Sequence, residues 1–166
     1  MQSKNQALQR LQGHMLFLAS ATHGLEAMLG RGAPSVAYAS GRKTGLKLQI
    51  AKRDPDDLLR ALATCRDEMD RLGIHWPFEP HKKKSEAALV APGADGELVV
   101  KLAVHHCMGR SSLLRYGHPQ KLSMCNMYHG LFSGILDQIY GGRAAVTIKH
   151  AGENACYLEL TVAKKK

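Results

Sequence analysis

The stretch from Cys125 to Val162 constrains the fold more than any other part of the sequence, because two different periodicities follow each other there. Between Leu122 and Tyr140, apolar residues recur at steps of three and four, which is the spacing of one face of an α-helix. Apolar and polar residues then alternate from Arg143 to His150, and again from Cys156 to Val162. The sequence therefore predicts a helix followed by a β-hairpin with its turn at 151–154.

Four possible metal ligands fall on matching faces of these elements. Cys125 and His129 are one turn apart on the apolar face of the helix, and strand alternation puts His150 and Cys156 on the apolar face of the hairpin, near its turn. About 13 helical residues cover roughly 20 Å and about 8 strand residues cover roughly 25 Å, so a strand that doubles back along the helix brings both pairs together. Two thiolates and two imidazoles suit tetrahedral zinc, which predicts a structural zinc site.

The same four residues also fit an ordinary core. Free cysteine is among the most buried residue types, and a histidine on a helix face can simply bond to a backbone carbonyl. A smaller ligand set is a further alternative, with three of the four residues binding and water or Glu153 completing the coordination.

The N-terminal half is predicted to form helices. The first spans about Gln6 to Leu29 at helical spacing, and the second begins near Pro34 and runs past Gly45. The acidic segment Asp54–Asp57 opens a third helix that stops at Gly73, since proline and acids favour the first turn.

A second hairpin is predicted before the long helix, from Glu86 to His106, with its turn at 92–96. Alternation along it points His106 inward and leaves His105 and Cys107 as an edge cluster. The predicted fold class is α+β: N-terminal helices packed on an antiparallel sheet made of two hairpins, with a long helix between the hairpins. We expect a single domain, 1–166, with a helical part at about 5–73 and a sheet-and-helix part at about 85–163.

Composition limits the possible partners. No apolar run reaches the roughly 20 residues of a membrane span and the N-terminus lacks the order of a signal peptide, so we expect a cytoplasmic protein. Part of the net charge of +9 lies in Lys82–Lys84 and Lys164–Lys166, which we interpret as solvated loop and tail charges. A basic nucleic-acid-binding module remains an alternative, but it is not favoured because no recognised binding motif accompanies the charge.

Two segments are candidates for binding a small ligand. Trp76 and Phe78 can either wall a pocket or simply cover the sheet edge. The segment from Met108 to Lys121 has no clear period and is predicted to be an irregular arm or lid, or an ordinary surface loop. Its Arg110, Arg115 and Tyr116 are candidate contacts to a ligand, and the arginines suit a carboxylate or phosphate.

Enzymatic activity finds less support, because no nucleophile triad, zinc-protease or nucleotide-binding fingerprint is present. A small lyase or hydrolase remains an alternative. It would use Cys107 beside His105 and His106 as an activated thiolate, or a zinc ion with an open position.

The order of these parts resembles the 4-vinyl reductase domain, also called the hydrocarbon-binding domain, over about 33–162. The residues that carry the resemblance are Gly41-x3-Gly45, Cys125-x4-Gly130-x3-Gly134 and Gly152-Glu153-x2-Cys156. The resemblance implies a fold like that of TRAPP trafficking subunits, a zinc site from cysteines of the last third and a pocket for small aromatic or tetrapyrrole-like molecules. Where that family has a further cysteine, this chain has His150, which would replace it.

Tyr38-x-Ser40-x-Arg42 also matches the Y-x-S-x-R string of haem-nitric-oxide-binding domains. Only His14 or His23 would be available as an axial ligand, so haem is not predicted. Our hypothesis is a domain that binds a small hydrophobic or aromatic ligand between the N-terminal helices, Trp76, Phe78 and the sheet, with an anionic ligand as an alternative. Its helices would also allow a homodimer.

Overall fold

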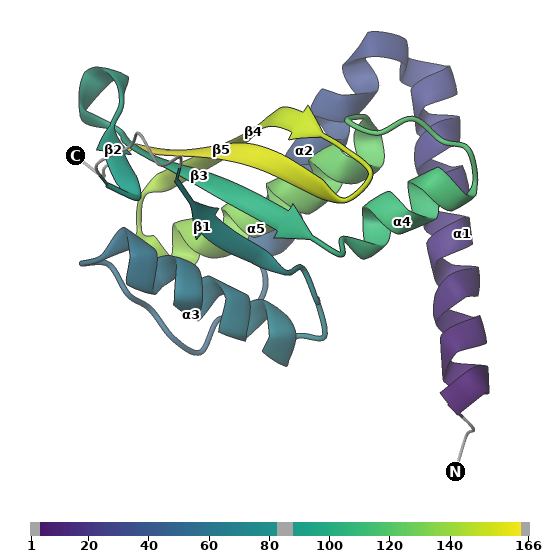
Figure 1. Cartoon of the computed structure of the whole chain (residues 1–166), viewed down its shortest axis with the longest axis horizontal. Helices are drawn as coiled ribbons and strands as arrows, with labels where there is room; N and C mark the ends of the chain where they lie inside the picture. The colour runs from purple at the N-terminus through teal and green to yellow at the C-terminus, as the bar shows by residue number, and fades with distance from the viewer. Residues whose placement is uncertain (1–3, 83–87, 164–166) are drawn as a thin grey trace.

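A computed structural model describes residues 4–82 and 88–163 and has the predicted α+β fold (Figure 1). Its helices are α1 (Lys4–Leu29), α2 (Ala33–Gly45), α3 (Leu58–Arg71), α4 (Met108–Arg115) and α5 (Ser123–Tyr140), with short 3-10 helices η1 (Gly30–Gly32) and η2 (Ala94–Gly96). Its strands are β1 (Phe78–His81), β2 (Val90–Pro92), β3 (Leu98–His105), β4 (Arg143–Ala151) and β5 (Ala155–Ala163).

The sheet is antiparallel, with the strand order β1-β3-β5-β4, and β2 also pairs with β3. Strand β3 pairs with β5 along its whole length, from Leu98 opposite Val162 to His105 opposite Ala155. The hairpin β4–β5 is thereby joined to the earlier strands in one continuous sheet. The start of the predicted first hairpin, at residues 86 and 87, lies outside the described residues, and β1 was not predicted.

Helix α5 packs against this sheet with the face that its sequence period predicts. Phe132, Leu136 and Ile139 are fully buried and meet Leu102 and Leu158 of β3 and β5 in the main hydrophobic core. Helix α3 lies beside α5, and its N-terminus is capped by a carboxylate of the acidic segment that predicted its start. The predicted long helix and the hairpin after it are confirmed.

Helices α2 and α5 touch at the level of their backbones. A Cβ atom on Gly130 would overlap the carbonyl oxygen of Tyr38, and one on Gly41 would overlap that of Met127. The hydroxyl of Tyr38 donates a hydrogen bond to Ser133 Oγ at 2.9 Å, across the same contact. The spaced glycines of both helices therefore serve close packing, and Tyr38 of the Y-x-S-x-R string contributes to that contact.

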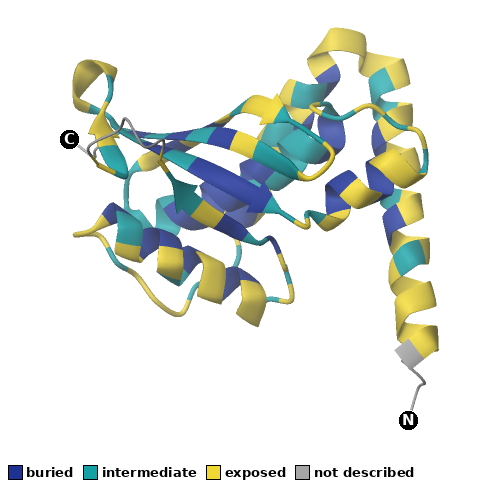
Figure 2. Cartoon of the chain, in the orientation of Figure 1, coloured by how far each residue is buried: buried dark blue, intermediate teal, exposed yellow. Residues whose placement is uncertain are grey.

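Helix α1 is only partly covered by the rest of the protein. Its Met15 and Ala19 are buried with Leu113 and Met124 in a second, smaller hydrophobic cluster. Further toward the N-terminus the helix projects away from the sheet and is mainly exposed (Figure 2). Phe17, which lies between the two buried residues, is 75% exposed. None of the described helices has both the length and the apolar character that a membrane crossing requires.

Two local predictions were wrong. The segment predicted as an irregular arm contains α4, whose glycine and serines weaken the helical signal in the sequence. His106 was expected to point inward, but its backbone is left-handed, with φ 49°, which breaks the strand alternation directly after β3. His106 is therefore exposed and Cys107 turns toward the interior.

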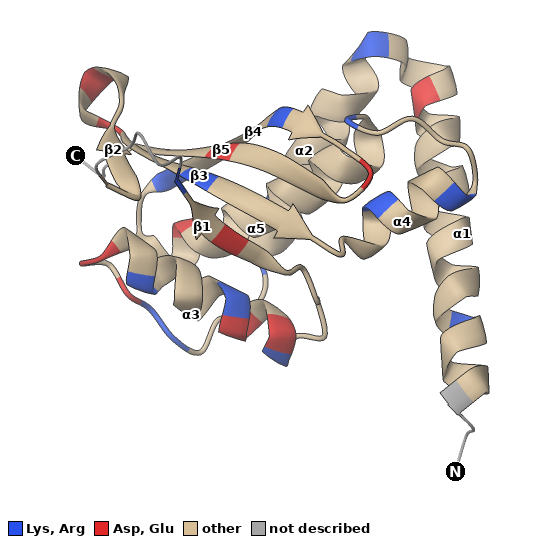
Figure 3. Cartoon of the chain, viewed as in Figure 1, with Lys and Arg blue, Asp and Glu red and all other residues tan. Residues whose placement is uncertain are grey.

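Among the residues that the structure describes, the basic side chains do not gather on one element (Figure 3). In Figure 3, Lys and Arg are interspersed with Asp and Glu along α3, and the others are spread over several helices and strands. Both predicted lysine blocks fall mainly outside the described residues, at positions 83, 84 and 164–166. Nucleic-acid binding therefore stays an alternative that is not favoured.

Candidate ligand cavity

A cavity of about 20 Å³ lies between α5, the start of α4 and the end of the sheet where β4 turns into β5. Helix α5 contributes Met124, Cys125, Tyr128 and His129, and the strands contribute Val104, Ile148, Ala151, Cys156 and Leu158. Cys107, Gly109 and Arg110 come from the start of α4, and Trp76 comes from the segment before β1. Trp76 and Leu158 belong to the main core and Met124 to the smaller cluster, so the cavity lies where the two meet.

Trp76 forms the aromatic wall of the cavity and is only 4% exposed. Its ring centroid lies 5.2 Å from that of Phe132, 5.6 Å from that of Phe78 and 5.7 Å from that of His129. Phe78 is buried in the core behind Trp76 and does not line the cavity. Of the two aromatic residues predicted to wall a pocket, the structure brings one to it.

His129 presents an unsatisfied polar atom in this apolar environment. The side chain is 5% exposed, and its Nδ1 has no hydrogen-bond partner within residues 4–82 and 88–163. Burial lowers the pKa of His129 to about 4. The imidazole is therefore neutral at pH 7, where one ring nitrogen donates and the other accepts a hydrogen bond.

Three cysteines, Cys107, Cys125 and Cys156, border the cavity. Burial raises the pKa of Cys125 to about 11, and the neighbouring cysteines act in the same direction. Burial likewise raises the pKa of Tyr128 to about 12. Cys125 and Tyr128 are thus protonated and uncharged at neutral pH.

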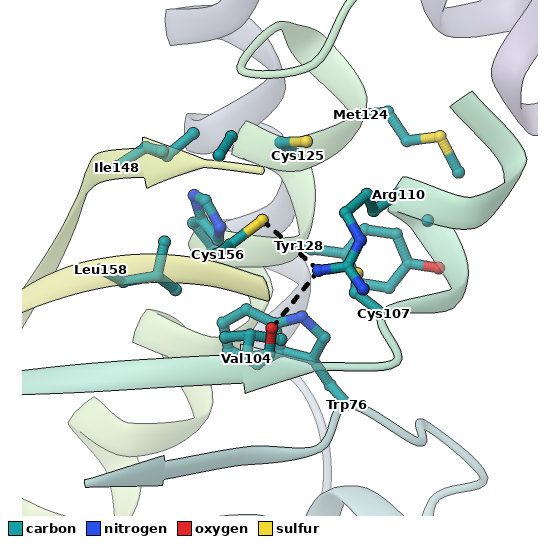
Figure 4. Close-up of a pocket in the computed structure, with 13 residues that line it drawn as sticks. Trp76, Val104, Cys107, Arg110, Met124, Cys125, Tyr128, Ile148, Cys156 and Leu158 are labelled. Carbon is teal, nitrogen blue, oxygen red and sulfur yellow. Dashed lines mark hydrogen bonds between the residues drawn. The ribbon is translucent and has the colours of Figure 1, made fainter. Parts of the chain in front are cut away.

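Arg110 is the charged residue of the lining. It is 4% exposed, and its Nη1 donates to the Val104 carbonyl oxygen at 3.4 Å and to Cys156 Sγ at 3.9 Å (Figure 4). Both contacts are long for hydrogen bonds, and Nε has no partner in the part of the chain that the structure describes.

The predicted zinc site is not supported. Cys125, His129 and Cys156 border the same cavity, but His150 does not. A β-bulge between Ile148 and His150 shifts the alternation of β4, so Ala151 faces the cavity and His150 lies beside the exposed ring of Tyr157, with centroids 6.2 Å apart. Among the described residues, no group of three or more His, Cys, Asp or Glu side chains can hold a metal ion.

The other predicted site residues lie outside the cavity, with the exception of Cys107. Arg115 is exposed at the end of α4, and Tyr116 follows it as the half-buried C-cap. Nε2 of His105 lies 3.4 Å from Oε1 of Glu79, and 45% of the His105 side chain is exposed. Of the proposed catalytic set, only Cys107 borders the cavity, so the structure does not assemble Cys107, His105 and His106. Met124 and Tyr128 were missed, although they share the helix turns of Cys125 and His129.

No family model matches the chain, and no curated protein matches it in sequence. A solved structure of an H-NOX protein from S. oneidensis, in the Fe(II)NO ligation state, matches with a TM-score of 0.41 and 15% identity, over 89% of this chain and 74% of that chain. The phenol-responsive sensory domain of the transcription activator PoxR, solved with phenol, matches with a TM-score of 0.56 and 14% identity, over 90% of this chain and 74% of that chain. The resemblance to the 4-vinyl reductase domain remains an expectation, and what the PoxR match shows is a shared fold.

Proposed function

We propose that this domain binds a small aromatic molecule in the cavity beside Trp76. The observation that carries the proposal is the make-up of the wall: an apolar and aromatic lining that contains a few polar atoms without partners. Small-molecule sites in proteins commonly combine a mainly apolar wall with a few polar groups that orient the ligand. The sensory domain of PoxR shares this fold and was solved with phenol, which supports the choice of an aromatic ligand.

His129 and Trp76 have complementary parts in this proposal. The indole offers a flat apolar surface for stacking, worth about 1 kcal/mol beyond the area it buries. The free Nδ1 of His129 then exchanges a hydrogen bond with a hydroxyl or similar group on the ring of the ligand. Because a buried polar atom without a partner is costly, a ligand that supplies this bond gains affinity over one that does not.

The cavity must widen to admit such a molecule. Its volume of about 20 Å³ has room for a water molecule, whereas a cavity that binds benzene measures roughly 150 Å³. The boundary between the two hydrophobic clusters is the natural place for this movement. The segment that carries α4 is bounded by left-handed backbone at His106 (φ 49°) and Lys121 (φ 67°), which a shift of the segment can relieve.

Isothermal titration calorimetry with phenol tests the proposal, with cyclohexanol as a non-aromatic control. The test variant is Ala151→Phe, which fills the cavity from β4, and the matched control is Ala145→Phe on the exposed side of the same strand. We expect phenol to bind the wild type and Ala145→Phe, and to bind Ala151→Phe at least roughly tenfold more weakly. Equal binding by all three proteins would place the ligand elsewhere and contradict the proposal.

A further inference from the structure

The side chain of Arg110 is buried without a counterion. An arginine side chain keeps its charge in proteins, and removing that charge from water is costly unless an anion and well-formed hydrogen bonds replace the solvent. Here the partners are a carbonyl oxygen at 3.4 Å and a thiol sulfur at 3.9 Å. No Asp or Glu within residues 4–82 and 88–163 forms an ion pair with Arg110, and none lines the cavity.

The carboxylates on the neighbouring helices α1 and α5 are partly buried and already engaged. Glu26 of α1 accepts a hydrogen bond from the backbone N–H of Ser123 at 2.7 Å, at the start of α5. Asp137, further along α5, pairs with Arg42 and accepts from the Ala144 N–H at 2.6 Å. No carboxylate of these elements is therefore left to neutralise the guanidinium.

One helix N-terminus adds to the positive character of the cavity. Gly109 and Arg110 are in the first turn of α4. The unpaired N–H groups of a first helical turn give it a partial positive charge that favours anions. Helix α4 has no N-cap side chain that forms a capping hydrogen bond, whereas the first turn of α5 already holds the Glu26 carboxylate on the N–H of Ser123.

We propose that the ligand of this cavity is an aromatic carboxylate, and that Arg110 binds its carboxylate group while Trp76 and the apolar wall bind its ring. This inference rests on the proposed function and names its ligand class. The planar guanidinium matches a carboxylate with two parallel hydrogen bonds, and its free Nε is one of the donors that such a pair uses. An inorganic anion would satisfy Arg110 but leave the aromatic wall unused.

Benzoate and benzamide form the matched pair of probes, because they have nearly the same shape and differ in charge at pH 7. We expect benzoate to bind the wild type at least roughly tenfold more tightly than benzamide. The reason is that hydrogen bonds from Arg110 to a charged carboxylate are stronger than those to a neutral amide. Acetate, which has the carboxylate without the ring, should bind much more weakly than benzoate. Binding is measured by calorimetry and by the fluorescence of Trp76, the single tryptophan of the chain.

Variants of α4 assign the preference to Arg110. Arg110→Met should lower benzoate affinity roughly 10- to 100-fold and leave benzamide affinity nearly unchanged. Arg110→Lys keeps the positive charge but lacks the planar guanidinium with its two parallel N–H donors, so it should lose part of the benzoate affinity. Arg115→Met, at the exposed end of the same helix, is the matched control and should bind like the wild type. Thermal melts of each variant check folding, and removal of an unpaired buried charge should not lower the melting temperature.

Three results would overturn the inference, and they separate it from the proposed function. Equal affinities of the wild type for benzoate and benzamide would refute the carboxylate and leave the aromatic site standing. Undiminished benzoate binding by folded Arg110→Met would refute the role of Arg110. Binding of neither benzoate nor benzamide nor phenol would refute the proposed function, and the inference with it.

Discussion

The rings of Trp76 and His129 lie 5.7 Å apart, centroid to centroid, on the wall of the same cavity. The two residues come from segments more than 50 positions apart, the connection before β1 and the first half of α5. Both are almost completely buried, yet Nδ1 of His129 has no partner among the described residues. This pair places an aromatic ring and a polar atom without a partner on the same part of the cavity wall.

The buried His129 should make the free energy of unfolding depend on pH. Burial lowers its pKa to about 4, below the value of about 6.5 for an exposed histidine. Between these values the unfolded state binds the proton and the folded state does not, so the protein loses about 1.4 kcal/mol per pH unit as the pH falls. Chemical denaturation at several pH values should show this loss in the wild type and not in His129→Phe. The control variant His14→Gln, at an exposed position, should show the same loss of stability as the wild type. If the free energy of unfolding changed with pH in the same way in the wild type and in His129→Phe, the prediction would be wrong.

The carboxylate of Glu68 should stabilise the fold at neutral pH. It is buried and accepts hydrogen bonds from Arg71 at 2.8 Å and from the Ala51 N–H at 3.0 Å, and chiefly the bond from Arg71 lowers its pKa. A lowered pKa contributes stability above the usual value of about 4.3, and this stability is lost as the pH falls through the folded value. Glu68→Gln should therefore lower the free energy of unfolding by about 2 kcal/mol at pH 7. The difference in stability between the variant and the wild type should become smaller at acidic pH. Glu153→Gln, at an exposed turn position, is the control and should change the free energy of unfolding little. If the stability lost in Glu68→Gln were the same at every pH, this account would be contradicted.

The contact between α2 and α5 should not tolerate a methyl group. Gly130→Ala places its Cβ against the carbonyl oxygen of Tyr38, a backbone atom that cannot rotate away, so the helices must separate. We expect a loss of about 3 kcal/mol in the free energy of unfolding. Gly24→Ala, in a stretch of α1 with open space around it, should instead gain about 1 kcal/mol from helix propensity. Similar melting temperatures for the two variants would contradict the close helix contact.

The cysteines should differ in their reactivity toward a thiol reagent at pH 8. Cys107 and Cys156 are half-buried beside the cavity and should react first. Cys125 should react slowly because burial raises its pKa to about 11, and the fully buried Cys65 should react only on unfolding. Phenol should slow the reactions of Cys107 and Cys156, as single-cysteine variants can show. Rapid labelling of Cys65 in the folded protein would disagree with the packing of α3.

The sequence predicted the elements that have a strong and regular period. Helix α5 and the hairpin β4–β5 follow directly from the spacing of their apolar residues, and the apolar face of α5 correctly brings Cys125 and His129 to the site. The β-bulge before His150 cannot be detected in the sequence. An extra residue in a strand changes which face the next side chains point to, and this change becomes visible only when the pairing with the neighbouring strand is known. Three of the four predicted zinc ligands therefore border one cavity, but the zinc site itself is not supported.

The role of Arg110 depends on features that only the folded chain reveals. In the sequence, Arg110 and Arg115 are equivalent candidates in a segment without a period. The left-handed turn at His106 and the short helix α4 bury the first and expose the second. The absence of a carboxylate next to Arg110 within the described residues is a tertiary property as well.

The most direct test of the central claim is an NMR titration of the indole N–H signal of Trp76 with phenol. The chain contains a single tryptophan, so this signal is assigned without ambiguity and reports on the cavity wall. Binding beside Trp76 predicts a saturable shift of the signal in the wild type and a much smaller shift in Ala151→Phe at the same phenol concentrations. A signal that stays unmoved while calorimetry detects binding would contradict the account, because the ligand would then occupy another part of the protein.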